Sequence, residues 1–118
     1  MARQQCAVIG IGQTRYYKKL DVSLDGLVRW AAQEALDDAG VDWKDIDAIV
    51  VATPPSTHYL LASIALESGK HVLVEKPLSL NIDEAKSLID MAKRHKLTLM
   101  VDHTFVYSGA VRMIRDII

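Results

Sequence analysis

The sequence lacks most of the features that mark a disulfide-stabilised, membrane-bound or nucleic-acid-binding protein. It has 118 residues and a single cysteine, Cys6, so no disulfide can form within the chain and we expect a reducing, cytoplasmic location. No apolar run approaches the roughly 20 residues that span a bilayer. The opening MARQQCAVIG lacks the apolar segment and cleavage site of a signal peptide. The formal net charge of -1 gives no reason to expect a nucleic acid or a membrane surface as partner.

Metal ligands are scarce as well. The four histidines have no spacing typical of metal ligands, and only one cysteine could join them. The sequence therefore predicts no metal site. The histidines in question are His58, His71, His95 and His103.

What the chain does contain is a strand–helix–strand unit over residues 46–77. The apolar run Ala48–Ala52 is short and rich in β-branched residues, which is typical of a buried strand. Two prolines end it, and Ser56 is predicted to cap a helix that stops at Gly69. Residues 71–75 predict the next buried strand. A helix between two buried strands favours a parallel pair.

The same alternation extends over the whole chain. Further strands are predicted at residues 6–9 and 97–101, and further helices at residues 23–39, 82–95 and 108–118. Ser23, Asn81 and Ser108 are the predicted N-caps of these helices, and Gly40 is predicted to end the first. We therefore predict an α/β fold in a single domain over residues 1–118. It would be a Rossmann-like half in two or three layers, with four parallel strands that alternate with four helices. The predicted strand order is 1-2-3-4, with 2-1-3-4 as the alternative.

The predicted strands are apolar on both faces, which raises the question of what covers them. Right-handed crossovers in the order 1-2-3-4 put the three connecting helices on one face. The other face then needs a cover, because a contiguous apolar face is rarely left in water. The last helix could fold under the sheet, the first strand could insert elsewhere, or a second copy could pack there. The last alternative predicts a homodimer.

Three stretches in the second half form a specific combination. They are DAIVVATPPSTH at 47–58, GKHVLVEKPLSL at 69–80 and LMVDHTFVYSGAVRMIRDII at 99–118. Through them, residues from about 46 to 118 resemble the Gfo/Idh/MocA family of NAD(P)-dependent oxidoreductases. The resemblance implies that this part corresponds to the second half of that family's dinucleotide-binding domain.

The same resemblance implies a cofactor-binding edge made by six residues. They are Thr53, Pro54, His58, Glu75, Lys76 and Pro77. The first two would line the ribose side of the cofactor, and the histidine would lie near it. The Glu-Lys-Pro sequence would sit beside the nicotinamide. Its Lys-Pro peptide bond would be cis, as it often is in that family.

Residues 1 to about 51 carry a different pattern. The element GIGQTR, followed by a long SL-x-x-LV-x-x-A-x-x-AL helix, is similar to the N-terminal segment of thiolase-like acyltransferases. The catalytic Cys and His of those enzymes come from later parts of their fold, and Cys6 does not match the nucleophile position. Both families could supply the strand IDAIVVATPP. We therefore infer a chimera of a thiolase-like segment (1–51) and an oxidoreductase-like segment (46–118), most economically explained by laboratory recombination or design.

The functional prediction follows from what such a chimera would lack. In GIGQTR, Arg15 stands where a dinucleotide fingerprint has its third glycine, and the helix begins only at Ser23. Lys76, Asp102 and His103 are expected at the carboxyl edge of the sheet, but we interpret them as inherited residues rather than catalytic ones. We therefore predict a self-associating scaffold that is not an enzyme, with no catalytic residue and no cofactor. The alternative is a weak residual NAD(P)-binding module that uses the six residues as a vestigial site.

Overall fold

The computed structural model describes residues 7–14 and 23–118. The chain divides into two compact units, Met1–Ile46 and Asp47–Ile118. Within the described residues, no helix has the length and apolar character that crossing a bilayer requires. The predicted single domain and the cytoplasmic location stay predictions.

The first unit contains the helix α1, Leu24–Ala39, followed by a 3₁₀ turn at Trp43–Asp45. As predicted, Ser23 caps α1, because its hydroxyl oxygen accepts the backbone N–H of Gly26 at 3.2 Å. Gly40 ends the helix in the left-handed conformation, with φ of 67°. Both ends of this helix are therefore confirmed as predicted.

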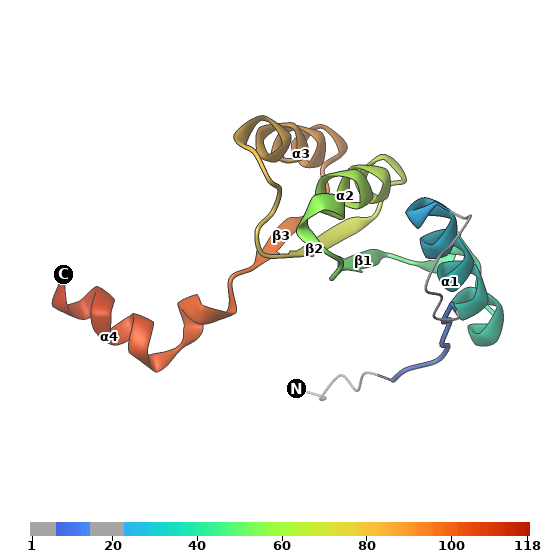
Figure 1. Ribbon diagram of the computed structural model, residues 1–118, viewed down its shortest axis with the longest axis horizontal. Helices are drawn as coiled ribbons and strands as arrows, with labels where there is room; N and C mark the ends of the chain where they lie inside the picture. The colour runs from blue at the N-terminus through green and yellow to red at the C-terminus, as the bar shows by residue number, and fades with distance from the viewer. Residues whose placement is uncertain (1–6, 15–22) are drawn as a thin grey trace. The chain divides into compact units, whose positions relative to one another are not determined.

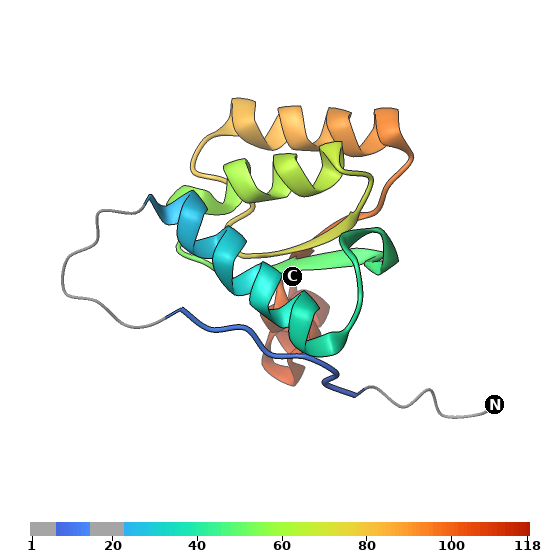
Figure 2. The same ribbon diagram turned by 90° about the vertical axis from the view of Figure 1, so that its right-hand side faces the viewer.

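The strand predicted at residues 6–9 is not formed. Cys6 lies outside the described residues, and residues 7–14 have no regular secondary structure. Their backbone is bound to α1 instead, since Ile11 donates its N–H to the Asp38 carboxylate and Gln13 donates to that of Glu34, each at 2.9 Å. Figure 2 shows this segment running beside α1. These two hydrogen bonds join the segment that follows residues 7–9 to α1 rather than to a strand.

The second unit is built on a parallel sheet of three strands. They are β1 (Ala48–Val51), β2 (His71–Glu75) and β3 (Leu99–Asp102), in the order β1-β2-β3. This confirms an α/β, Rossmann-like arrangement, with three strands among the described residues rather than the predicted four. In the predicted order, residues 6–9 are strand 1, and β1, β2 and β3 are strands 2, 3 and 4. The alternative order 2-1-3-4 is wrong, because it would put strand 1 between β1 and β2, which pair directly with each other.

Two helices cover one face of this sheet, as Figures 1 and 2 both show. They are α2 (His58–Glu67) and α3 (Ile82–His95). The core between helices and sheet consists of small and medium apolar side chains. It is made of Val51, Ala62, Ala65, Leu66, Val72, Val74, Leu88, Met91 and Ala92. Burial of these nine apolar side chains stabilises the packing of α2 and α3 on one face of the sheet.

The ends of α2 and α3 test the predicted caps. Ser56 does not cap α2, because Pro55–Thr57 forms a 3₁₀ turn first and no side chain caps the helix. Gly69 follows α2 in the left-handed conformation, as predicted, with φ of 76°. Asn81 caps α3, as predicted, because its side-chain oxygen accepts the N–H of Glu84 at 2.9 Å.

Among residues 47–118, no helix covers the other face of the sheet, which we call its open face. Neighbouring strands align Val50, Leu73 and Met100 in one row on this face, and Val50 is 67% exposed. The last helix, α4 (Gly109–Ile117), is capped by Ser108 as predicted. Every residue of α4 is exposed, so α4 does not fold under the sheet. The homodimer predicted from the need to cover this face stays a prediction.

Candidate functional site

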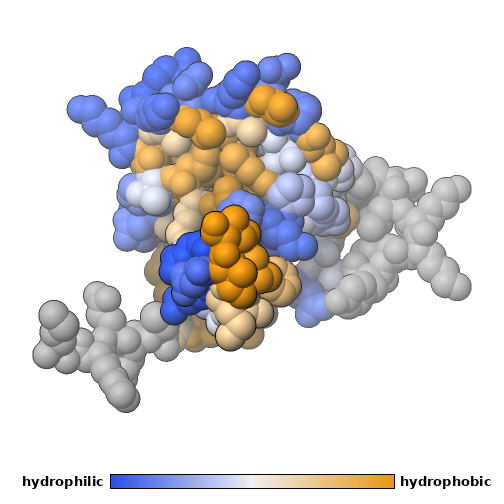
Figure 3. Space-filling view, turned by 90° about the vertical axis from the view of Figure 1, so that its left-hand side faces the viewer, coloured by the Kyte–Doolittle hydropathy of each residue, from blue (hydrophilic) through white to orange (hydrophobic). Residues whose placement is uncertain are grey.

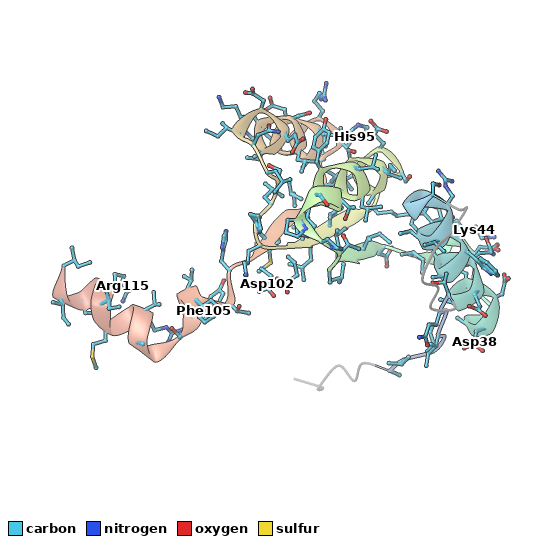
Figure 4. All side chains as sticks on the ribbon, viewed as in Figure 1. Asp38, Lys44, His95, Asp102, Phe105 and Arg115 are labelled. Atoms are coloured by element: carbon cyan, nitrogen blue, oxygen red, sulfur yellow. The ribbon has the colours of Figure 1, made fainter. Side chains whose placement is uncertain are left out.

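The candidate site is the carboxyl edge of the sheet, where all three parallel strands end on the same side. Val51 ends β1 and is paired with Val74, which precedes Glu75 at the end of β2. Glu75 is paired in turn with Asp102, the last residue of β3. Figure 4 labels Asp102 at this end of β3. Open α/β sheets bind ligands just outside the carboxyl ends of their strands, so this edge is where a site is expected.

A buried histidine links two of the turns at this edge. His58, the first residue of α2, is 1% exposed. Its Nε2 lies 2.8 Å from the carbonyl oxygen of Thr53, which follows β1. Its Nδ1 lies 2.7 Å from the carbonyl oxygen of Pro77, which follows β2. One side chain therefore connects the turn after β1 with the turn after β2.

The turn after β1 is also held by two threonine hydroxyls. The Thr57 hydroxyl donates to the carbonyl oxygen of Pro54 at 2.8 Å. Because a hydroxyl has one proton, Thr57 can only accept in its 2.7 Å contact with the Thr53 hydroxyl. Thr53 therefore donates to Thr57 and keeps its own oxygen lone pairs for another donor. Sequence analysis missed Thr57, although a threonine three residues after a turn carbonyl is a known local hydrogen-bonding pattern.

The ionisable side chains of the edge lie at the ends of β2 and β3 and in the turn after β2. Glu75 and Asp102 lie on the open face of the sheet, since strand residues alternate between faces and Val74 points to the core. Lys76 is exposed, and its backbone N–H donates to the Glu75 carboxylate at 3.3 Å. The Lys76–Pro77 peptide bond is cis, as the resemblance implied. A cation and two carboxylates thus share this corner.

The structure brings the six predicted residues to the same edge: four lie in the two turns, Glu75 ends β2 and His58 begins α2. Their exposure separates them by role. Pro54, Lys76 and Pro77 are exposed, Thr53 and Glu75 are half-buried, and His58 is buried. A ligand at the edge could touch the first five, whereas His58 can act only through its neighbours. His103 lies just beyond β3 and is exposed.

Comparison with known proteins identifies the family. Residues 26–103 match the profile of the Gfo/Idh/MocA family, described as an oxidoreductase family with an NAD-binding Rossmann fold. The chain belongs to this family. It is 38% identical over 72 residues to UDP-N-acetylglucosamine 3-dehydrogenase of Acidithiobacillus ferrooxidans, covering 61% of this chain and 23% of that protein. It is 32% identical over 110 residues to scyllo-inositol 2-dehydrogenase (NAD(+)) of Bacillus subtilis, covering 75% and 32%.

Solved structures give the same family relationship. A 3-ketoreductase from Actinomadura kijaniata, crystallised with NADP and TDP-benzene, superposes with a TM-score of 0.61 at 29% identity. That superposition covers 74% of this chain and 30% of the reductase. The chain spans between 17% and 32% of the length of the curated relatives compared with it.

The match to this oxidoreductase family overturns the predicted chimera. The profile match extends from residue 26, inside α1, to residue 103, and so lies on both sides of the junction predicted near residue 51. No finding supports a thiolase-like segment. The predictions of a scaffold that is not an enzyme and of no cofactor are also wrong at the level of the family, whose matched relatives are named dehydrogenases and reductases. Those predictions depended on the thiolase-like pattern of the opening residues. A short glycine-containing turn followed by a helix is not specific to one family, so this pattern does not identify a function.

The glycines of GIGQTR have a packing role in the first unit. A Cβ atom at Gly10 would overlap the Ala35 carbonyl oxygen, and one at Gly12 would overlap that of Ala31. Both glycines therefore allow the segment to lie directly against α1. The N–H groups of Ile11 and Gln13 are bound to α1 carboxylates, so these amides are not offered to a phosphate. Arg15 lies outside the described residues.

Two other features lie away from the strand ends. A shallow hollow of about 400 Å³ is lined by four residues of α3, namely Ser87, Asp90, Lys93 and Arg94. One exposed helix surface alone forms it. Among residues 7–14 and 23–118, no three His, Cys, Asp or Glu side chains gather closely enough to hold a metal ion.

Proposed function

We propose that this chain is the part of a Gfo/Idh/MocA oxidoreductase that binds NAD(P), with the dinucleotide held at the carboxyl edge of β1–β2–β3. The observation that carries the proposal is the position of the six family-motif residues, which gather at this edge, where His58 links the turn after β1 with the turn after β2. The family's description as NAD-binding and the NADP bound to the solved Actinomadura reductase support it.

The residues at the edge fit a dinucleotide. The exposed ammonium of Lys76 complements an anionic or polar ligand. The Thr53 hydroxyl, whose proton is used toward Thr57, would accept from a ribose hydroxyl. Pro54 would pack against the ribose side, and Pro77 beside the nicotinamide. The bound cofactor would supply the acceptor or donor of a hydride.

For the whole protein we propose oxidation of a ring alcohol of a sugar or cyclitol to a ketone, or the reverse reduction of that ketone. The matched relatives include a dehydrogenase named for UDP-N-acetylglucosamine and one named for scyllo-inositol. Converting an alcohol to a ketone releases a proton as well as a hydride, so a side chain must hold that proton. Lys76, with Asp102 on the neighbouring strand end, is the group at this edge suited to that role.

Titration of the protein with NAD(H) and NADP(H), followed by calorimetry, tests the proposal. The wild-type chain should bind at least one of these cofactors saturably. Lys76→Ala should raise the Kd about tenfold, which corresponds to the loss of about 1.4 kcal/mol. The matched control is Lys86→Ala, because Lys86 is an equally charged and exposed lysine on α3. It should leave the Kd unchanged.

Two results would contradict the proposal. One is the absence of saturable binding for all four nucleotides. The other is an equal effect of the two lysine substitutions, which would mean that any affinity comes from net charge rather than from the edge of the sheet.

A further inference from the structure

His58 has an unusual set of neighbours for a buried histidine. Both ring nitrogens lie within hydrogen-bonding distance of a backbone carbonyl oxygen, at 2.7 Å and 2.8 Å, and the side chain is 1% exposed. A carbonyl oxygen only accepts, so each contact is a hydrogen bond only when the nitrogen facing it carries a proton. Both bonds together therefore need a ring that carries a proton on both nitrogens, which is the positively charged imidazolium, whereas a neutral ring would bond only one of the two carbonyls.

The two acceptors belong to turns that are far apart in the sequence. Thr53 follows β1 and Pro77 follows β2, and these strands are neighbours in the sheet. The turn at Thr53 is held a second time, by its hydroxyl contact with Thr57, the residue before His58. The start of α2 thus fixes the turn after β1 through two adjacent side chains, and reaches the turn after β2 through His58.

We propose that His58 is a positioning residue that donates from both ring nitrogens and thereby sets the spacing between the Thr53–Pro54 turn and the Lys76–Pro77 turn. This rests on the proposed function, because these two turns are the proposed NAD(P) edge. His58 is too deeply buried to touch a ligand at that edge. It acts on the cofactor through the backbone that carries Thr53 and Lys76. Loss of either bond would let one turn move relative to the other.

The first experiment reads the ring directly. In the wild-type protein labelled with 15N-histidine, NMR should detect a proton on both ring nitrogens of His58, each exchanging slowly with water because the ring is buried. A single protonated nitrogen would overturn the proposal, since only one turn would then be held. This measurement needs no cofactor, so it stands even if the chain binds no NAD(P).

The second experiment asks whether the link matters for the site. His58→Leu removes both donors, and should shift the backbone amide signals of Thr53 and Lys76 together and raise the Kd for NAD(H) at least tenfold. His58→Gln keeps an N–H donor and should restore part of that affinity. If His58→Leu does not fold, the comparison of His58→Gln with the wild type and the ring measurement decide the proposal.

The chain offers a matched control in His71. This histidine starts β2, at the opposite end of the strand from the site, and its Nδ1 accepts the backbone N–H of Thr98 at 2.8 Å. His71→Leu therefore also removes a histidine bond to the backbone, and should leave the Kd unchanged. Equal losses of affinity in His58→Leu and His71→Leu would overturn the proposal, because general loosening of the fold would then explain both. Saturable wild-type binding with an unaffected His58→Leu would also overturn it while leaving the proposed function intact.

Discussion

The two faces of the sheet have similar side chains and very different surroundings. On the covered face, Val51 and Val74 are 3% and 0% exposed beneath α2 and α3. On the open face, the adjacent Val50 is 67% exposed and Met100 is 49% exposed. Apolar strands alone therefore do not determine burial. Burial follows the helices, which the parallel connections β1–α2–β2 and β2–α3–β3 place on the same side.

The largest expected effect is on the covered face. Val74→Asp would bury a carboxylate within the hydrophobic core, where Val74 is 0% exposed. We expect the substitution to cost several kcal/mol and to leave the second unit largely unfolded, because domains are stable by only about 5–15 kcal/mol. Far-UV circular dichroism with urea titration measures this. A cooperative transition like that of the wild type would mean that the two faces do not differ as described.

Shortening a covering side chain should have the next largest effect. Leu88 on α3 is 0% exposed, so Leu88→Ala should lower the free energy of unfolding by about 2–5 kcal/mol. Its neighbour Ile89 is 41% exposed and gives the control. Ile89→Ala should cost clearly less, and urea denaturation of both variants decides. Equal costs would contradict the orientation of α3 on the sheet.

A smaller effect is expected at the start of α3. Asn81→Ala removes the acceptor for the N–H of Glu84 and should lower the free energy of unfolding by about 1 kcal/mol. Asn81→Asp keeps an acceptor oxygen and should recover most of the loss. Thermal denaturation of the three proteins checks this, and an Asn81→Asp protein no more stable than Asn81→Ala would show that the cap contributes nothing.

The smallest effect on the stability of a single chain is expected on the open face. Val50→Asp places a charge where the side chain is already mostly in water, so the free energy of unfolding should change by no more than about 0.5 kcal/mol. The homodimer predicted from the sequence gives this variant a second readout. Light scattering should find a dimer for the wild type and a monomer for Val50→Asp. A wild-type monomer at all concentrations would contradict the dimer.

The amphipathic last helix adds to this comparison. Figure 3 shows hydrophobic residues gathered on one side of α4 and hydrophilic residues on the other. Met113, Ile114 and Ile117 are all more than half exposed. The pattern alone predicted the helix and its cap at Ser108, since helical spacing and capping are local. It did not determine what the apolar side packs against.

For the candidate site, the family motifs indicated which residues lie at the edge of the sheet, but not which of their side chains face a ligand. The six residues carried over from the family motifs lie at one edge, because turns that follow parallel strands meet on one side of a sheet. The division of labour among them was not predictable. A histidine in a motif suggests a group that faces the ligand, but the ring of His58 lies between two backbone carbonyls contributed by turns after different strands.

Local sequence patterns were enough to predict two strands, β1 and β2, and four helix ends, at Ser23, Gly40, Asn81 and Ser108. Each depends on residues only a few positions apart, so spacing and caps are enough. Two features became visible in three dimensions alone. Residues 7–14 lie along α1 instead of forming a strand, and α2 and α3 cover the same face of the sheet and leave Val50 on the other face exposed. Both outcomes depend on which distant groups compete for the same backbone hydrogen bonds and apolar surface, and a local pattern does not contain that information.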